Sequence, residues 1–383
     1  MATARRFWLK RLTYLLYFIL YAAVAQGQAG TAKNSAGSSY PVYALRLHYG
    51  VIYAHTKYVE NTAGAHPRGF EFEISKQHID KPLWENYRCY PRMGLILSYF
   101  DFNTRILGKT YSAAYFIEPD YRVSKNCSFF LRMGVGLSYL TNPHDSIKNP
   151  TNQSYSLPIN AYLTAGAGIN CNVSPHIALS FMTSFQHNSN GGFELPNHGV
   201  NYPTASLGIR YTAYNNSLPV YKREQVRSYR HTKIIYDAGF YYSPKSGYSA
   251  GWVSSRKYLA GVFVQASKRV STLDNITLSL EAYHDGGLAS IKKLLMDNTS
   301  NNLVGLMIGH EFIFRRILFS QQLGYYIYKD TKTFSDLYQQ AFPRIYHRWG
   351  LRYKLNPHWY AGFNMLAHNQ VADFIDLRLN YRF

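Results

Sequence analysis

The sequence has 383 residues but no long apolar stretch after residue 25, and only 16% of its residues are charged. Soluble domains carry roughly 25% charged residues, so this composition is unusual for one. Without a further apolar run of about 20 residues, no second helix could cross a bilayer. Any further membrane residence must come from strands, because only helices and closed barrels satisfy every backbone group in lipid.

Cysteine is also scarce. Cys89, Cys127 and Cys171 are an odd number of widely spaced thiols without a CxxC pair, which excludes the common thiolate metal and redox motifs. One disulfide could form, but we expect none to be needed. No spacing of His, Asp and Glu suggests a metal site, and no Gly-rich phosphate loop occurs. We therefore expect no cofactor.

The N-terminal segment has the pattern of an export signal. Four basic residues precede an apolar run over residues 12–24, and Ala23-Val24-Ala25 supplies a small-x-small cleavage pattern. We predict a signal peptide over residues 1–25. An uncleaved anchor is the alternative, but the run is short for a spanning helix and a polar stretch follows it. No cysteine follows the run, which argues against a lipoprotein anchor.

Aromatic and basic residues are abundant. The chain contains 36 Tyr and 22 Phe, a bias typical of the aromatic girdles of outer-membrane barrels. Its formal net charge is +20. Exported chains rarely meet nucleic acid, so we expect anionic lipid head groups, including the phosphates of lipopolysaccharide, to be the counter-charge and no nucleic acid to be bound. The alternative is that the excess Lys and Arg simply solvate surface loops.

Apolar and polar residues alternate over segments of about ten residues, the pattern of transmembrane strands. We predict strands near residues 43–54, 68–76, 92–103, 110–123, 127–140, 159–172, 175–188 and 203–214. A second set falls near residues 232–243, 256–269, 274–284, 302–314, 317–328, 343–354, 357–367 and 371–383. The last strand ends in Phe383, which resembles the C-terminal pattern of bacterial outer-membrane proteins.

The two sets of strands resemble each other. Pro175-His176 leads through a strand to His187-Asn188, and Pro357-His358 leads through a strand to His368-Asn369. The predicted fold is therefore all-β, a transmembrane antiparallel barrel built as two tandem eight-stranded units over residues 43–214 and 231–383. Residues 215–230 would link them, and the second unit would be a degenerate repeat. A single barrel of 14–16 strands remains the alternative.

The segment with the clearest chemistry follows the strand near residues 175–188. His187 and Ser189 continue its apolar, lipid-facing row, because side chains at i and i+2 share one face. Polar groups on the lipid side are costly, which favours a functional role. A hydroxyl and an imidazole at this spacing suit activation of a serine by a general base. Asn190, Gly191 and Gly192 follow and could supply oxyanion donors. A turn that merely closes a hairpin is the alternative.

His187-x-Ser189-Asn190-Gly191, followed by Pro196-Asn197-His198-Gly199, resembles the lipid A 3-O-deacylases, outer-membrane barrels related to acyloxyacyl hydrolases. The longer Bacteroidetes relatives look most similar, and the resemblance covers roughly residues 44–214. It implies that His187 is the general base and Ser189 the nucleophile, with Asn190 and Gly191 holding the oxyanion.

The third member of the family's triad is a glutamate, and this sequence departs from the family there. Asn201 occupies its place. An asparagine can fix the tautomer of an imidazole but does not stabilise the imidazolium electrostatically. Glu194 is the alternative acid. His368 lies on the opposite face of its strand and has no serine two residues later, so we interpret it as structural.

Together these patterns predict an outer-membrane serine esterase of a Gram-negative bacterium that removes an ester-linked acyl chain from lipid A or a related glycolipid. One alternative is a porin-like or structural barrel with a vestigial motif, which would need a water-filled lumen and more strands. Another is a non-catalytic barrel that binds lipopolysaccharide or a protein through its basic second unit.

Overall fold

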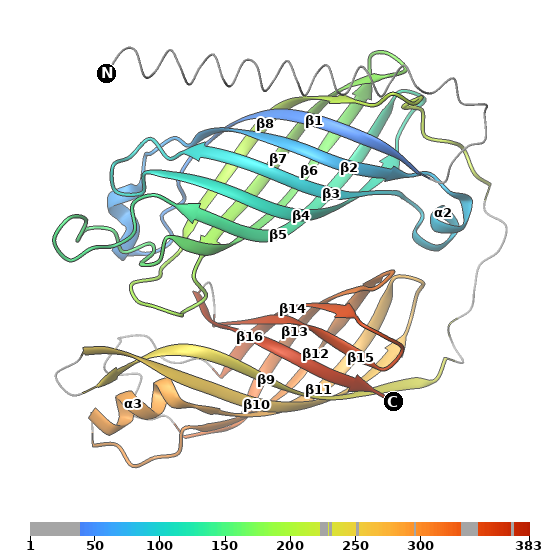
Figure 1. The fold of residues 1–383 in the computed structure, drawn as a ribbon. Coiled ribbons are helices and arrows are strands. Elements are labelled where there is room, and N and C mark those ends of the chain that lie inside the picture. Colours follow the sequence, from blue (N-terminus) through green and yellow to red (C-terminus); the bar gives the residue numbers. More distant parts are fainter. Residues whose placement is uncertain are drawn as a thin grey trace.

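A computed structural model describes residues 39–222, 229, 232–249, 253–294, 296–330, 344–368 and 371–383. It contains two closed antiparallel barrels of eight strands each (Figure 1). The predicted all-β architecture of two eight-stranded barrels is confirmed, and the single barrel of 14–16 strands is wrong. Within the described residues, no helix is both long and apolar enough to span a membrane. The predicted signal peptide lies outside the described residues.

Each barrel closes by pairing its first strand with its last, β1 with β8 and β9 with β16. The first barrel comprises β1 (Ser39–Gly50), β2 (Arg68–His78), β3 (Tyr90–Asp101), β4 (Lys109–Arg122), β5 (Cys127–Leu140), β6 (Ile159–Asn172), β7 (Ile177–Ser189) and β8 (Val200–Tyr211). The second comprises β9 (Ile234–Ser249), β10 (Val253–Arg269), β11 (Asp274–Asp285), β12 (Asn302–Phe314), β13 (Ile317–Lys329), β14 (Ile345–Lys354), β15 (Trp359–His368) and β16 (Val371–Arg382). In the part of the chain that the structure describes, three short helices lie in the connections: η1 (Lys57–Thr62), α2 (Lys81–Tyr87) and α3 (Gly286–Leu294).

The alternation in the sequence separates a lipid-facing surface from a polar interior. On β8, Leu207 and Ile209 are exposed, whereas Ser206 and Arg210 are buried. The other strands repeat this pattern, so each barrel presents a continuous apolar belt to its surroundings. An outward-facing apolar belt around a polar interior is the arrangement of outer-membrane barrels.

The first strand differs from its predicted range. β1 ends at Gly50 rather than near residue 54, although Val51 and Tyr53 continue the exposed apolar row. The chain leaves the ladder with β2 here but still donates backbone hydrogen bonds to β8, from Val51 N to Pro203 O and from Tyr53 N to Asn201 O. The alternation of exposed and buried residues therefore continues beyond the end of β1, because residues 51–53 still run along the edge of β8.

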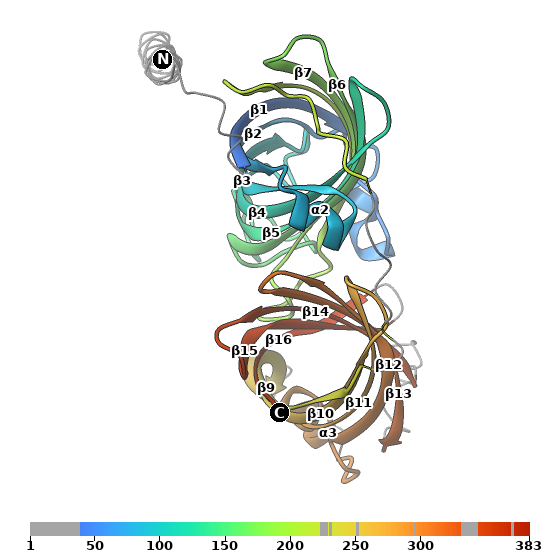
Figure 2. The ribbon, with the colours of Figure 1, turned by 90° about the vertical axis from the view of Figure 1, so that its right-hand side faces the viewer.

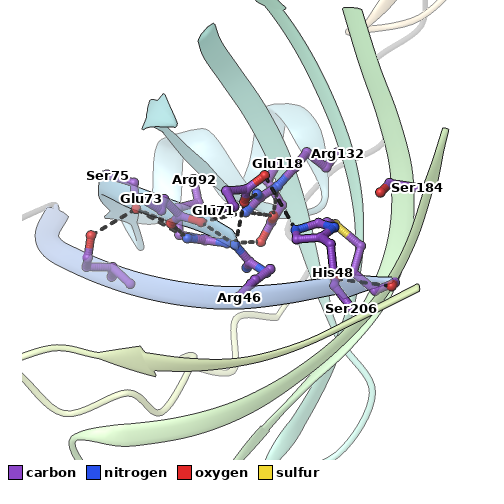
Figure 3. A network of polar contacts seen from close by, with 12 residues as sticks. Arg46, His48, Glu71, Glu73, Ser75, Arg92, Glu118, Arg132, Ser184 and Ser206 are labelled. Atoms are coloured by element: carbon purple, nitrogen blue, oxygen red, sulfur yellow. Dashed lines mark hydrogen bonds and ion pairs between the residues drawn. The ribbon is translucent and has the colours of Figure 1, made fainter. Parts of the chain in front are cut away.

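Ion pairs fill the interior of the first barrel (Figure 3). The Arg132 guanidinium lies 2.6 Å from a carboxylate oxygen of each of Glu71, Glu73 and Glu118. Three arginines, Arg46, Arg92 and Arg132, face three glutamates, Glu71, Glu73 and Glu118, and all six side chains are buried. The alternation of charged and apolar residues along β1 to β5 thus becomes a cross-strand network inside the barrel.

Arg132→Met is expected to destabilise the first barrel by about 3 kcal/mol or more, because it leaves three buried carboxylates with too little counter-charge. Urea unfolding of the protein in lipid vesicles measures this change in the free energy of unfolding. Arg105→Met is the control, since Arg105 is exposed in the β3–β4 connection. Equal stabilities of the two variants would contradict the assigned role of the network.

The second barrel is filled in the same way. Arg348 contacts Glu281 at 2.8 Å and Asp376 at 2.5 Å, and Arg378 contacts Asp376 at 2.6 Å. Tyrosines and other large apolar side chains pack toward the end of the barrel near α3. Eight strands enclose just enough room for side chains, so neither interior is a water-filled channel and the porin-like alternative does not fit.

The two barrels lie side by side, with α3 and the β1–β2, β5–β6 and β7–β8 connections at the same end (Figures 1 and 2). At the opposite end, where α2 lies, Arg315 N donates to Tyr87 Oη at 3.0 Å, and the rings of Tyr87 and Phe314 lie 4.8 Å apart. At the other end the β7–β8 connection contacts the second barrel, since Ser246 N donates to Gly192 O at 3.1 Å. Both barrels can therefore cross one bilayer together.

The structure corrects the expectation about disulfides. Cys127 on β5 and Cys171 on β6 are direct register partners, and a disulfide joins them. Neighbouring strands hold these thiols together, which wide separation in the sequence conceals. Cys89 is free and buried.

Candidate functional site

His187 lies near the long-connection end of β7. It continues the outward row of Phe181 and Phe185, but it is half-buried whereas those two are exposed. Its register partners are Leu163 on β6 and Asn201 on β8. The imidazole thus lies on the outer wall of the barrel, where the apolar belt meets the long connections.

Asn201 is hydrogen-bonded to His187. The Asn201 Oδ1 lies 2.5 Å from His187 Nδ1, and the Asn201 Nδ2 lies 3.0 Å from His55 Nδ1. An amide oxygen only accepts and an amide nitrogen only donates. His187 therefore carries its proton on Nδ1 and leaves the Nε2 lone pair free, while His55 accepts at Nδ1. Glu194, the alternative acid, is exposed, and its backbone carbonyl accepts from Asn190 Nδ2 at 2.8 Å.

His55 reaches this site from the β1–β2 connection. The hydrogen bond from Tyr53 N to Asn201 O carries that connection along β8. His55 then completes a chain of three polar side chains, His55, Asn201 and His187, although 146 residues separate His55 from Asn201. Sequence reasoning did not identify His55, because its neighbours in the sequence form no motif with it.

Ser189 is the last residue of β7, and it is buried, with only 5% of its surface exposed. The Ser189 Oγ accepts from Gly191 N at 3.0 Å and from Asn197 Nδ2 at 3.4 Å. Neither partner is His187. The serine shares the strand face of His187 but is covered rather than open to lipid, because Asn197 from the β7–β8 connection lies against it.

Asn190 organises this connection. Its Nδ2 donates to Ser156 Oγ at 3.0 Å, its Oδ1 accepts from Gly192 N at 3.0 Å, and its backbone N–H donates to Asn197 Oδ1 at 2.9 Å. Both ends of the amide are thus engaged in loop contacts. The Gly191 N–H points at Ser189 Oγ, which makes it the predicted oxyanion donor nearest the hydroxyl.

Glycine is required beside the histidine. Gly199 has φ +78°, and a Cβ there would lie 2.7 Å from His187 Cε1. A side chain at this position would strain the backbone and displace the imidazole. The glycine that closes the Pro196-to-Gly199 motif therefore makes room for the ring.

Two residues of the β7–β8 connection also brace the site. Asn197 holds Ser189 as described, and the His198 ring stacks on Tyr58 with centroids 4.6 Å apart. Burial lowers the pKa of His198, and the neighbouring His55 lowers it further. Both residues lie within the sequence motif, but only the fold shows what they contact.

His368 has a different environment. Its Nε2 lies 3.1 Å from Tyr326 Oη, and Tyr326 belongs to the buried cluster of the second barrel. Its inward direction matches the prediction from strand parity. Within the described residues, no group of three or more His, Cys, Asp or Glu side chains could hold a metal ion.

Comparison with solved structures finds other barrels. The outer-membrane enzyme PagL is 13% identical and aligns over 43% of this chain and 97% of its own, with a TM-score of 0.30. Neisserial surface protein A is 14% identical over 46% and 97%, with a TM-score of 0.29. Ail, the attachment invasion locus protein of Yersinia pestis, is 16% identical over 45% and 97%, with a TM-score of 0.25. No curated protein matches the sequence.

Two family models match the sequence. The model of lipid A 3-O-deacylase matches residues 76–210, which include His187, Ser189 and Asn201. The model of the acyloxyacyl hydrolase C-terminal domain matches residues 232–383, which form the second barrel. The chain therefore belongs to the lipid A 3-O-deacylase and acyloxyacyl hydrolase-like family of the bacterial outer membrane.

Proposed function

We propose that this protein is a serine esterase that removes an ester-linked acyl chain from lipid A or a related glycolipid in the outer leaflet. The observation that carries the proposal is the hydrogen bond between His187 Nδ1 and Asn201 Oδ1, which leaves Nε2 as a base two residues from Ser189. A base held in one tautomer beside a hydroxyl is the requirement for activating a serine.

The reaction proceeds through an acyl-enzyme. The Ser189 hydroxyl, whose oxygen accepts from Gly191 and Asn197, first turns so that it donates its proton to His187 Nε2, a rearrangement that substrate binding can drive, since catalytic hydrogen bonds often tighten only in the complex. Oγ then attacks the ester carbonyl carbon as its proton passes to Nε2. The tetrahedral intermediate collapses, the C–O bond to the sugar breaks, and the Nε2 proton moves to the departing oxygen. A water molecule, deprotonated by Nε2, hydrolyses the acyl-enzyme and frees the fatty acid.

The oxyanion formed during attack needs donors. Gly191 N–H already lies 3.0 Å from Ser189 Oγ, so it is close to where the oxyanion would develop. Asn190 supports this donor indirectly, by folding the connection through Ser156 and Gly192. We therefore assign the oxyanion contact to Gly191 and a supporting contact to Asn190.

The position of the site fits a substrate that lies in the membrane. His187 lies at the boundary between the exposed apolar row of β7 and the long connections. Acyl chains could lie along the apolar wall while the sugar and phosphates face the connections. The net charge of +20 favours an anionic glycolipid.

Mass spectrometry of lipid A tests this function directly. Vesicles containing lipopolysaccharide and the purified protein should accumulate lipid A that lacks one acyl chain, with an equal amount of free fatty acid. Ser189→Ala should produce neither. If the wild-type protein leaves every lipopolysaccharide and phospholipid tested intact, the proposal is wrong and a non-catalytic role in binding lipopolysaccharide becomes the better account.

A further inference from the structure

The seam that closes the second barrel is open at the end where the active site lies. Among the described residues, backbone pairing between β9 and β16 extends as far as Tyr242 and Leu377 and no further. Both strands continue beyond that point, β9 as far as Ser249 and β16 from Val371. An open strand edge presents backbone N–H and C=O groups that need partners.

The first barrel supplies partners for this edge. Ser246 N donates to Gly192 O at 3.1 Å, and Ser246 Oγ donates to Phe193 O at 3.0 Å. Both acceptors lie in the β7–β8 connection, three and four residues after Ser189. The connection that carries the candidate oxyanion donor is thus hydrogen-bonded to β9.

The same connection also packs against β16. A Cβ on Gly191 would lie 2.8 Å from Ile375 Cδ1, and a Cβ on Gly192 would lie 2.7 Å from Asp373 O. Both glycines have positive φ, +68° and +83°. A Cβ on Gly192 would meet the backbone of β16 and push the connection off the second barrel, whereas a Cβ on Gly191 would meet only the flexible end of the Ile375 side chain.

The two sides of the open seam are tied to each other. Lys245 Nζ lies 2.8 Å from Asp373 and 2.7 Å from Asp285, and Ser243 Oγ donates to Ile375 O at 2.7 Å. Side chains here replace the missing backbone ladder between β9 and β16. The surface on which Gly191 to Phe193 rests is therefore built by contacts within the second barrel.

From these contacts we infer that the second barrel positions the oxyanion segment of the first barrel, with Ser246 and Ile375 as positioning residues. Gly191 donates its N–H to Ser189 Oγ, and the space that a Cβ on Gly191 would need is taken by the Ile375 side chain. Ser246 donates hydrogen bonds to the carbonyl oxygens of Gly192 and Phe193, and so it limits rotation of the peptide units that follow the Gly191 N–H. This inference rests on the proposed esterase function, and it gives the second barrel a catalytic task without a second active site.

Disulfide trapping tests the docking itself. An ideal Cβ on Gly191 lies 3.3 Å from Ile375 Cβ, close to the separation that a disulfide spans. Gly191→Cys with Ile375→Cys should cross-link the barrels under mild oxidation, because replacing Ile375 also removes the Cδ1 atom that the new Cβ would meet. Gly191→Cys with Leu377→Cys, two residues along the same face of β16, should not. Absence of the first cross-link in folded protein overturns the inference, whatever the esterase activity.

Kinetics test the positioning role. Ser246→Ala combined with Ile375→Ala should lower kcat about tenfold or more, because losing a well-placed oxyanion donor outright costs 10²–10³-fold. KM should stay within about twofold, since ground-state binding is untouched. Leu377→Ala, exposed to lipid on the same strand, is the control and should keep wild-type kcat.

An unchanged kcat in the double variant overturns the positioning role even if the cross-link forms. A raised KM with unchanged kcat would instead place these residues in substrate binding and also overturn it. The proposed function fails separately, when wild-type protein cleaves no ester or Ser189→Ala retains activity. The cross-link still reports on docking in that case.

Discussion

Ser189→Ala is expected to lower kcat for ester cleavage by about 10⁵-fold or more, because serine hydrolases lose roughly that factor when the nucleophile is removed. The matched control is Ser180→Ala on the same strand. Ser180 faces the barrel interior, and its hydroxyl has no hydrogen-bond partner within the described residues, so its removal should leave both folding and kcat unchanged.

Non-additivity sharpens this prediction. His187→Ala should cost nearly as much as Ser189→Ala, and the double variant should be no slower than either, since the two groups act as one unit. Initial rates of fatty acid release from lipopolysaccharide vesicles measure all three. Losses that multiply in the double variant would contradict the assignment of His187 as the base of Ser189.

The strands could be predicted closely because each carries its own signal. β5 and β6 have the same bounds in the structure as in the prediction, residues 127–140 and 159–172. Alternation is local and follows directly from one face meeting lipid and the other a polar interior. The prediction of two closed barrels rested on the occurrence of this pattern in two similar sets of strands, not on any single strand.

The contacts that join distant strands could not be predicted in the same way. Arg132 on β5 contacts Glu71 on β2, 61 residues away, and the disulfide joins two cysteines 44 residues apart. Strand parity showed that such residues face inward or outward. It gave no information on which partner each would meet, because that depends on the register around the closed barrel.

The candidate site likewise combines residues that a local motif indicates with residues that only the closed fold brings together. His187, Ser189 and Asn201 came from a short motif and a family resemblance, whereas His55 meets Asn201 only because the β1–β2 connection follows β8 after closure. The contacts of the β7–β8 connection with Ser246 and Ile375 depend on how the two barrels lie against each other, which no pattern in the sequence indicates. Residues that act on the motif from other elements have no pattern in the sequence.

Asn201→Ala is expected to lower kcat about a thousandfold, because removal of the carboxylate that orients the base in a serine protease costs more than 10⁴-fold and a neutral amide supplies only the orienting part. Asn201→Asp should instead raise kcat about tenfold, since a hydrogen bond from the imidazolium to a charged acceptor is stronger by roughly 1.4 kcal/mol. Initial rates at saturating lipopolysaccharide measure both changes.

His55 controls the orientation of the native Asn201 amide, on which its support of His187 depends. Asn201 must present Oδ1 rather than Nδ2 to His187, and the hydrogen bond from Nδ2 to His55 Nδ1 holds it that way round. His55→Phe should therefore lower kcat about tenfold in the native background, where the amide becomes free to turn over and misplace the His187 proton. The loss is predicted in kcat and not in KM.

The same substitution should be harmless once a carboxylate replaces the amide. In the Asn201→Asp background both side-chain oxygens accept hydrogen bonds, so either orientation serves His187 and His55→Phe should leave kcat unchanged. A double-mutant cycle over the two positions measures this coupling. Equal losses in the two backgrounds would show that His55 only supports the fold of its connection, because a structural defect does not depend on which acceptor faces His187.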